Sequence, residues 1–478
     1  MTAHDRIGTL RVLEPVLETH RADRGRCAMT RNGTAGAGRV PGGGGRTGPA
    51  CLLAMLATLA GATPAPATAG SAPERSGRDL AAFALRDGDR VVFYGDSITQ
   101  DGGYTRFVEE YVATRFPDWD VRFYNAGVGG DTVKGGWAGD VDVRLQRDVV
   151  DHRPSVVTVM LGMNDGGYKP YDPATFATYA DGFGAIVERL SRDLPEVRMT
   201  LIHPSPFDDV TRPPGFAPGY DDVLRRYGCY VEALAARERQ GVADFRAPLN
   251  AGLAAVHAAN PDLARQILPD RVHPSAAGHL VMGAALLRAW NAPALVSRVE
   301  IDAAEAEVVS AENAATSGLE VAEGRLRWTQ HDRALPLPMN FDDAEVALAE
   351  AAGAGIEALD QQPLVVRGLA PGRYELKIDG EAVATFDDAE LAAGVNLAAH
   401  GTPMRWQAYT VKWAAGDRQE IQRVRRHLLA AGADAGRVAA TAAALAEEDE
   451  AMQRERREAA RPRPRAFEIR AAEKPAPR

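Results

Sequence analysis

The chain of 478 residues contains only three cysteines, Cys27, Cys51 and Cys229. Two of them lie within the first 69 residues, so a chain without that segment keeps Cys229 alone and forms no internal disulfide. A chain of this length can bury a core that needs no covalent cross-links. The cysteine content therefore excludes a disulfide-rich scaffold.

Long apolar runs and an excess of positive charge are also lacking. No uninterrupted stretch reaches the roughly 18 apolar residues that indicate a transmembrane helix. The formal net charge is -10, which argues against nucleic acid as the main partner, because phosphate binding requires a basic face. The hydrophobic share of 45% and the charged share of 25% are typical of soluble globular proteins, and we expect no stable membrane insertion.

Residues 1–69 have the composition of a leader segment. A stretch rich in Gly and Arg at 33–48 precedes an apolar run at 50–60, and small residues then lead to Ala67-Thr68-Ala69. A basic flank, a short apolar run and a small-residue cleavage site predict a secretory signal peptide, and hence a secreted or periplasmic protein. Translation from Met29 would give it a more usual length, and a loose apolar linker is the alternative interpretation.

Four segments of the chain place small and polar residues directly after an apolar run or before a helix. The segments are Gly95-Asp96-Ser97, the stretch 125–131, Gly162-Met163-Asn164-Asp165 and Asp270-Arg271-Val272-His273. Ligands of open α/β sheets bind at the carboxyl ends of the strands, so these residues are expected to meet at one edge of a sheet. Gly-Asp-Ser on its own fits a simple turn equally well, with Ser97 as a helix N-cap.

Taken together, the four segments resemble the conserved blocks of the SGNH hydrolases, also called GDSL-type esterases, from about residue 87 to about residue 290. The resemblance implies a serine esterase with Ser97 as nucleophile, His273 as general base and Asp270 as the carboxylate that orients the base. It also implies that the Ser97 and Gly130 N–H groups and the Asn164 side-chain amide bind the oxyanion.

Elementary chemistry is consistent with these implied roles. Histidine titrates near neutrality and can move a proton in both directions. Asp270 lies three residues before His273, so one loop can place its carboxylate on the imidazole and fix the tautomer. Gly130 has no Cβ, which lets its N–H approach a substrate oxygen and tolerates positive φ.

Further residues are candidates for substrate contacts. They are Asp96, Asp131, Tyr168 and Phe216, together with Trp137 and, in the long proline-rich segment 203–220, Arg212 and Tyr220. That segment follows a strand and is expected to overhang the site, although an inert loop fits as well. We expect no metal, since His273 and His279 lie six residues apart rather than on one helix face, and no cofactor, since the sequence has no nucleotide motif.

Strands are predicted at 90–95, 120–124, 155–161, 198–203 and 242–245. Helices are predicted at 104–115, 132–148, 173–192, 221–239 and 275–290. This alternation indicates an α/β fold, a three-layer α/β/α sandwich around a parallel sheet, over residues 87–295. The family resemblance adds a flavodoxin-like strand order.

After residue 296 the pattern of apolar and polar residues changes. Period-2 alternation and Pro-Gly turns predict a small β-rich accessory module at 297–400, which either packs on the catalytic domain or binds glycan. Residues 401–460 are expected to form a helical segment whose charged surface is solvated. The Pro- and Arg-rich residues 461–478 are predicted to be a disordered tail.

The sequence therefore predicts an exported esterase that acts on short acyl esters of a small molecule or polysaccharide, with O-acetyl groups on carbohydrate favoured by analogy. Two alternatives stay open. One is a glycan O-acyltransferase, and the other is a glycan-binding protein on an inactive SGNH fold.

Overall fold

A computed structural model describes residues 82–322, 324–430 and 435–472. The predicted leader at 1–69, with its signal peptide and possible start at Met29, lies outside the described residues.

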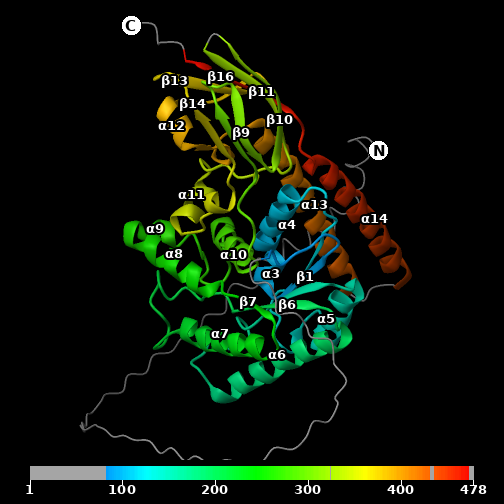
Figure 1. Ribbon diagram of the computed structural model, residues 1–478. Coiled ribbons are helices and arrows are strands. Elements are labelled where there is room, and N and C mark those ends of the chain that lie inside the picture. Colours follow the sequence, from blue (N-terminus) through cyan, green and yellow to red (C-terminus); the bar gives the residue numbers. More distant parts are fainter. Residues whose placement is uncertain (1–81, 323, 431–434, 473–478) are drawn as a thin grey trace, which may run out of the picture. The chain divides into compact units, whose positions relative to one another are not determined.

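A five-stranded parallel sheet forms the centre of the N-terminal part of this structure (Figure 1). Its strands lie in the order β2-β1-β5-β6-β7, which is the expected flavodoxin-like order. The strands are β1 (Arg90–Gly95), β2 (Arg122–Gly127), β5 (Val156–Met160), β6 (Arg198–Ile202) and β7 (Gly241–Ala243). Strands β1 and β5 are buried almost throughout, because helices cover both faces of a parallel sheet.

Helices form a layer on each side of this sheet, which confirms the predicted α/β/α sandwich (Figure 1). One group that packs together is α4 (Gly103–Arg115), α8 (Arg246–Ala259) and α10 (Ala276–Ala289). The other is α5 (Val141–Asp148), α6 (Pro173–Asp193) and α7 (Tyr220–Arg237). Two short helices, α3 (Ser97–Asp101) and α9 (Pro261–Ala264), and the 3-10 turn η1 (Val150–His152) complete this part.

The helix predicted to begin at residue 132 begins nine residues later. Residues Gly135–Gly136 and Gly139–Asp140 form the short hairpin β3–β4, and the Asp140 side chain then caps α5 by accepting a hydrogen bond from Val143 N. Glycine favours such tight turns over helix, which is why the helix gives way here.

A mixed sheet and an antiparallel sheet follow the sandwich in the sequence. The first has the order β15-β12-β8-β9 and the second the order β10-β11-β16-β13-β14. Their strands are β8 (Arg298–Asp302), β9 (Glu307–Glu312), β10 (Ala314–Ala322), β11 (Arg325–Asp332), β12 (Pro363–Arg367), β13 (Arg373–Ile378), β14 (Glu381–Asp387), β15 (Val395–Asn396) and β16 (Arg465–Ala471). Two helices, α11 (Ala344–Ala351) and α12 (Asp388–Ala393), and the 3-10 turns η2 (Glu357–Leu359) and η3 (Leu397–Ala399) lie between these strands in the sequence.

The prediction of a disordered tail at 461–478 is wrong for residues 465–471. These residues form β16, the central strand of the second sheet, where it pairs with β11 on one side and β13 on the other. Phe467 and Ile469 alternate with polar residues and are buried in the core of the module. Burial of these two apolar side chains favours an ordered strand, although the surrounding Pro and Arg residues have the composition of a disordered segment.

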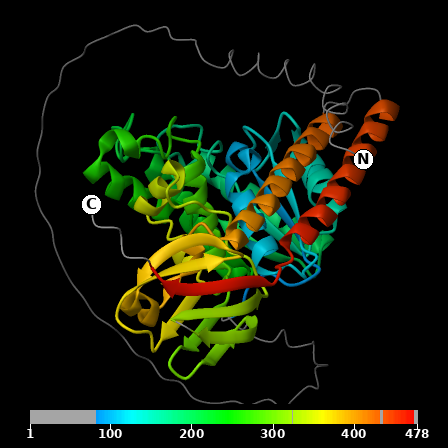
Figure 2. The same cartoon turned by 90° about the horizontal axis from the view of Figure 1, so that it is seen from above.

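Two long helices, α13 (Pro403–Ala430) and α14 (Ala435–Ala460), lie side by side and pack against α4 (Figures 1 and 2). Their charged residues were expected to be solvated, but several are buried. Arg418 of α13 and Arg456 of α14 both donate to the carboxylate of Glu109 in α4, and all three side chains are at least 97% buried. An internal ion-pair network therefore holds the helix pair against the sandwich.

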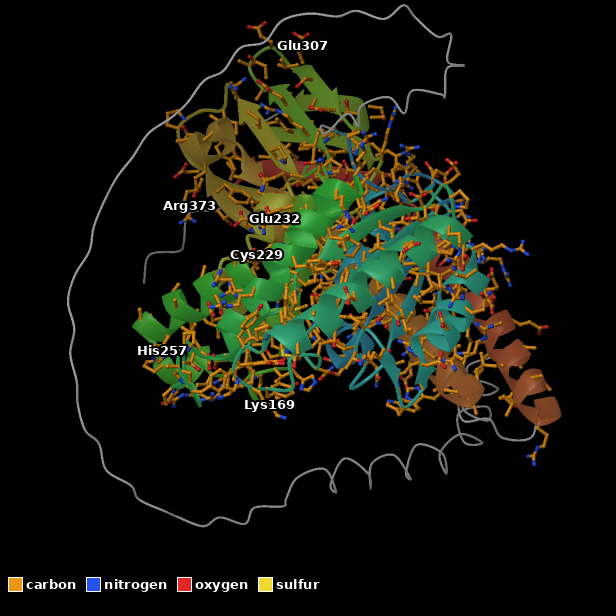
Figure 3. The ribbon with its side chains drawn as sticks, turned by 90° about the horizontal axis from the view of Figure 1, so that it is seen from below. Lys169, Cys229, Glu232, His257, Glu307 and Arg373 are labelled. Carbon is orange, nitrogen blue, oxygen red and sulfur yellow. The ribbon has the colours of Figure 1, made fainter. Side chains whose placement is uncertain are left out.

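Cys229 is a free thiol on the exposed side of α7, near Glu232 (Figure 3). None of the helices in the described part of the chain has the combination of length and apolar composition that a membrane crossing needs.

Candidate active site

Ser97 lies at the junction between β1 and α3. Asp96 caps the helix, since its carboxylate accepts a hydrogen bond of 3.0 Å from Ile98 N. The junction is tight: a Cβ on Gly127, at the end of β2, would lie 2.2 Å from the backbone nitrogen of Gln100. The two strand ends therefore hold α3, and with it Ser97, at the carboxyl edge of the sheet.

The structure brings Ser97, His273 and Asp270 into one hydrogen-bonded line. Ser97 Oγ lies 2.8 Å from His273 Nε2, and His273 Nδ1 lies 2.7 Å from Asp270 Oδ2. With the ring proton on Nδ1, the imidazole donates to the carboxylate and accepts from the serine hydroxyl. This arrangement allows a proton to move from the hydroxyl to the imidazole.

The carboxylate of Asp270 is held in its charged form. Partial burial raises its pKa, but hydrogen bonds from the backbone N–H and ring of His273 and from Val272 N outweigh that effect, so its pKa lies below the usual value. An ionised Asp270 favours the protonated imidazole that forms when Ser97 loses its proton. The His273 side chain is 46% exposed, so a substrate can approach it from solvent.

Three candidate donors surround the space in front of Ser97. Among the described residues, the N–H groups of Ser97 and Gly130 have no protein acceptor, and Gly130 has the positive φ of 77° expected for this turn. A Cβ on the neighbouring Gly129 would lie 3.9 Å from Ser97 Cβ, so the turn closely approaches the serine. The Asn164 amide donates to the Asp131 carbonyl at 3.0 Å, which leaves its second N–H available.

Each of the two peptide units that meet at Gly129 is held by one side chain. The Gly129 N–H donates to Gln100 Oε1 at 2.6 Å, and the indole N–H of Trp137 donates to the Gly129 carbonyl at 3.0 Å. In a trans peptide the carbonyl of Gly129 and the N–H of Gly130 point in opposite directions. Trp137 therefore sets the direction of the Gly130 N–H, a role that its sequence position did not indicate.

Three carboxylates follow or precede the site residues directly in the sequence; Asp96 and Asp131 are buried, and Asp165 is partly buried. Burial raises the pKa of Asp96 to about 7 and that of Asp165 to about 6. Asp165 accepts from Val133 N at 2.9 Å, and Asp131 binds Arg144 at 2.8 Å with both side chains 0% exposed. Asp96 and Asp131 were candidates for substrate contacts, but this burial shields their carboxylates from solvent.

Tyr168 lies at the open side of the site. Its hydroxyl donates to Asn164 Oδ1 at 3.2 Å, and its side chain is 44% exposed. Burial of the hydroxyl and the nearby carboxylates of Asp96 and Asp270 raise its pKa to about 12, so it stays a hydrogen-bond donor at neutral pH. This position is compatible with the predicted substrate contact.

The segment 203–220 braces the loop that carries Asp270 and His273. Arg212, a candidate for a substrate contact, binds Asp208 at 2.7 Å and donates to the carbonyls of Leu268 at 3.1 Å and Pro269 at 2.8 Å. No sequence pattern indicates this contact, because it joins residues more than 50 positions apart.

The two aromatic candidates of this segment lie against the core. Phe216 is partly buried and packs against the core of the sandwich. Tyr220 is 2% exposed, and its hydroxyl donates to the Met163 carbonyl at 2.6 Å.

The histidines considered as metal ligands have separate partners. His273 binds Ser97 and Asp270, whereas His279 Nε2 lies 2.8 Å from Asp101 Oδ2. Within the described residues, no three His, Cys, Asp or Glu side chains are grouped so that they could hold a metal ion.

Comparison with known proteins finds a family model and similar proteins. Residues 93–281 match the model of the GDSL-like Lipase/Acylhydrolase family. An acetylxylan esterase of Geobacillus stearothermophilus is 28% identical over 227 residues, which cover 43% of this chain and 94% of that protein. The solved structure of a gut microbial diltiazem-metabolizing enzyme is 26% identical, with a TM-score of 0.74, and covers 82% of this chain and 100% of its own.

Proposed function

We propose that the protein, whose residues 93–281 belong to the GDSL-like acylhydrolases of the SGNH superfamily, removes O-acetyl groups from carbohydrate by a Ser97-His273-Asp270 mechanism. The family membership makes the protein a carboxylic ester hydrolase. The observation that carries the proposal is the line of two short hydrogen bonds from Ser97 Oγ through the His273 ring to Asp270.

The proposed reaction has two steps. Ser97 Oγ attacks the acetyl carbonyl while His273 Nε2 takes its proton, and the same proton then passes to the departing sugar hydroxyl. Water attacks the resulting acetyl-serine with His273 again as base, which releases acetate and restores Ser97.

Stabilisation of the oxyanion completes the proposed mechanism. The free N–H groups of Ser97 and Gly130 and the second N–H of Asn164 are the donors that the negative oxygen requires. These donors are already oriented, so little reorganisation is needed when charge develops.

The similarity to an acetylxylan esterase supports an acetylated carbohydrate as substrate. The test is release of acetate from acetylated xylan, with diltiazem as the competing substrate suggested by the structural relative. We expect release without any added sugar acceptor, faster turnover of the xylan than of diltiazem, and loss of activity in Ser97→Ala. The exposed Ser191→Ala on α6 is the matched control and should keep full activity.

Acetate release that depends on a sugar acceptor would replace hydrolysis by acyl transfer. Binding of xylan without any acetate release would instead favour the glycan-binding alternative.

We also propose that the protein is exported through its leader. The supporting observation is the order of basic, apolar and small residues before Ala69. N-terminal sequencing of the protein recovered from outside the cytoplasm should find a start near residue 70, and recovery of only the intact chain inside the cells would contradict export.

A further inference from the structure

A cavity of about 450 Å³ lies between the sandwich and the helix pair α13–α14. Its walls come from β1, β2, α5 and η1 on one side and from α13 and α14 on the other. The volume falls within the range of small-molecule sites, about 300–1000 Å³. None of the three residues of the Ser97-His273-Asp270 line contributes to its wall.

Three of the arginines that line this cavity have no carboxylate partner within the described part of the chain: Arg90, Arg425 and Arg426. The guanidinium of Arg90 donates to the Tyr124 hydroxyl at 3.3 Å, and that of Arg426 donates to the carbonyl of Asn125. Arg425 makes no hydrogen bond or ion pair with any described residue. The Nε atoms of all three are buried and lack an acceptor.

The carboxylates that line the cavity are already bound elsewhere. Asp148 binds Arg144 and Arg147, Asp449 binds Arg418 at 2.8 Å, and Glu450 binds Arg122. The remaining one, Asp151, accepts from the amide of Gln146 at 2.8 Å. Among the described residues, none of these four carboxylates forms an ion pair with Arg90, Arg425 or Arg426, since Asp148, Asp449 and Glu450 are paired with other arginines.

The imidazole of His152 adds a hydrogen-bond donor to the cavity wall. The Tyr124 ring packs against the His152 ring with centroids 4.3 Å apart. The Arg90 guanidinium lies over the Tyr124 ring, 5.5 Å from its centroid. Burial and the positive charge of Arg425 lower the pKa of His152 to about 4. A neutral imidazole at physiological pH can donate one N–H without a further charge.

Buried guanidinium groups without a counter-charge are costly, and Arg426 is only 8% exposed. The side chain best suited to bind phosphate or sulfate is arginine, because its planar N–H groups match the oxygens of these anions. We propose that this cavity binds a tetrahedral oxyanion, the phosphate or sulfate group of a small ligand, between Arg90, Arg425 and Arg426.

The proposed site lies close to the serine but is separate from it. The Asn125 carbonyl accepts from Arg426, while the Asn125 side chain donates to the Thr99 carbonyl of α3 at 2.6 Å and accepts from Gly127 N at 3.0 Å. A bound anion would thus contact the arginine that supports the α3–β2 junction. It would not occupy the space in front of Ser97.

The test measures binding of inorganic phosphate and of sulfate to the full chain by titration calorimetry, with sodium chloride of equal ionic strength as background. We expect saturable binding of one anion per chain and a rise in Tm with phosphate over chloride. Arg425→Gln removes one cation of the site without breaking a hydrogen bond, and should weaken binding at least tenfold. Arg437→Gln, which removes an exposed arginine of α14 outside the cavity wall, should bind as the wild type does.

Two results would overturn the proposal. One is no saturable binding of either anion up to about 10 mM, a concentration at which even a weak specific site fills. The other is an equal loss of binding in both variants, which would indicate diffuse attraction to positive charge.

Glucose 6-phosphate as a second probe identifies the source of the anion. Tighter binding than inorganic phosphate would indicate a phosphate ester, and weaker binding would indicate the free ion; both results support the site. Phosphate that competes with p-nitrophenyl acetate for the esterase centre would contradict a separate site, and this readout does not depend on which natural ester the enzyme cleaves.

Discussion

Replacement of Trp137 by Phe tests how the Gly130 N–H is oriented. The change removes one hydrogen bond, the 3.0 Å contact from the indole N–H to the Gly129 carbonyl, and keeps an aromatic ring beside His427, whose ring centroid lies 5.6 Å away. A neutral hydrogen bond contributes about 0.5–1.5 kcal/mol. Trp137 is 61% exposed, so water competes for this contact and a loss of about 1 kcal/mol is expected.

That loss should fall on the transition state, because in the proposed mechanism the Gly130 N–H binds the substrate oxygen only once this oxygen carries charge. A loss of about 1 kcal/mol corresponds to a fall in kcat of about fivefold, well below the 100- to 1000-fold typical for removal of a whole oxyanion donor. The assay is the hydrolysis of p-nitrophenyl acetate, with kcat and KM determined separately. KM should change little.

The matched control is Trp413→Phe, which alters an equally exposed tryptophan on α13 and should leave kcat unchanged. An unchanged kcat in Trp137→Phe would refute the orienting role. A rise in KM at constant kcat would instead make Trp137 a substrate contact, as the sequence first indicated.

Three further changes test other parts of the account. Gly130→Ala places a side chain at φ 77°, where no atom lies within 4 Å, so strain of about 1–2 kcal/mol rather than a clash should shift the N–H and lower kcat at least tenfold; an unaltered kcat would contradict the oxyanion assignment. Asp96→Asn keeps the cap acceptor but removes a carboxyl whose pKa rises from 3.8 to about 7 on folding. Wild-type stability from this group is therefore present below pH 4 and lost as pH rises to 7, so the unfolding free energy of the variant minus that of the wild type should rise by up to about 4 kcal/mol from pH 4 to pH 8; equal pH dependence of variant and wild type in urea titrations would exclude this. Arg212→Met removes the contacts to the Leu268 and Pro269 carbonyls, so amide exchange in 268–273 should quicken and kcat fall about tenfold; unchanged exchange would show that the brace is dispensable.

The central sheet could be predicted from the sequence because its strands are apolar on both faces and end on glycine and polar residues. Val91 to Tyr94 and Val156 to Met160 are buried on each side, and this pattern is visible without a structure. The residues at the strand ends, Ser97 and Asn164 among them, were placed at one edge of the sheet by the same reasoning.

Elements that depend on distant partners could not be predicted in this way. Strand β16 pairs with strands that lie about 90 to 140 residues earlier in the chain, and its neighbours in sequence have the composition of a disordered tail. Helix α5 begins at residue 141 instead of the predicted 132, because three glycines before it favour a hairpin over a helix.

The supporting contacts of the site also have no periodic signature. Arg144 reaches Asp131 from the next helix, and Gln100 reaches Gly129 across the strand ends. Such side chains are recognisable only when the fold has brought them together, whereas the residues that they support stand in short motifs.

The measurement that tests the central claim most directly is covalent labelling of the folded protein by a fluorophosphonate, followed by intact mass and peptide mapping. Ser97 in contact with His273 should form a single adduct, which is absent in Ser97→Ala and forms far more slowly in His273→Ala. Folded protein that forms no adduct, or forms it on another serine, would contradict the assignment of Ser97 as the nucleophile.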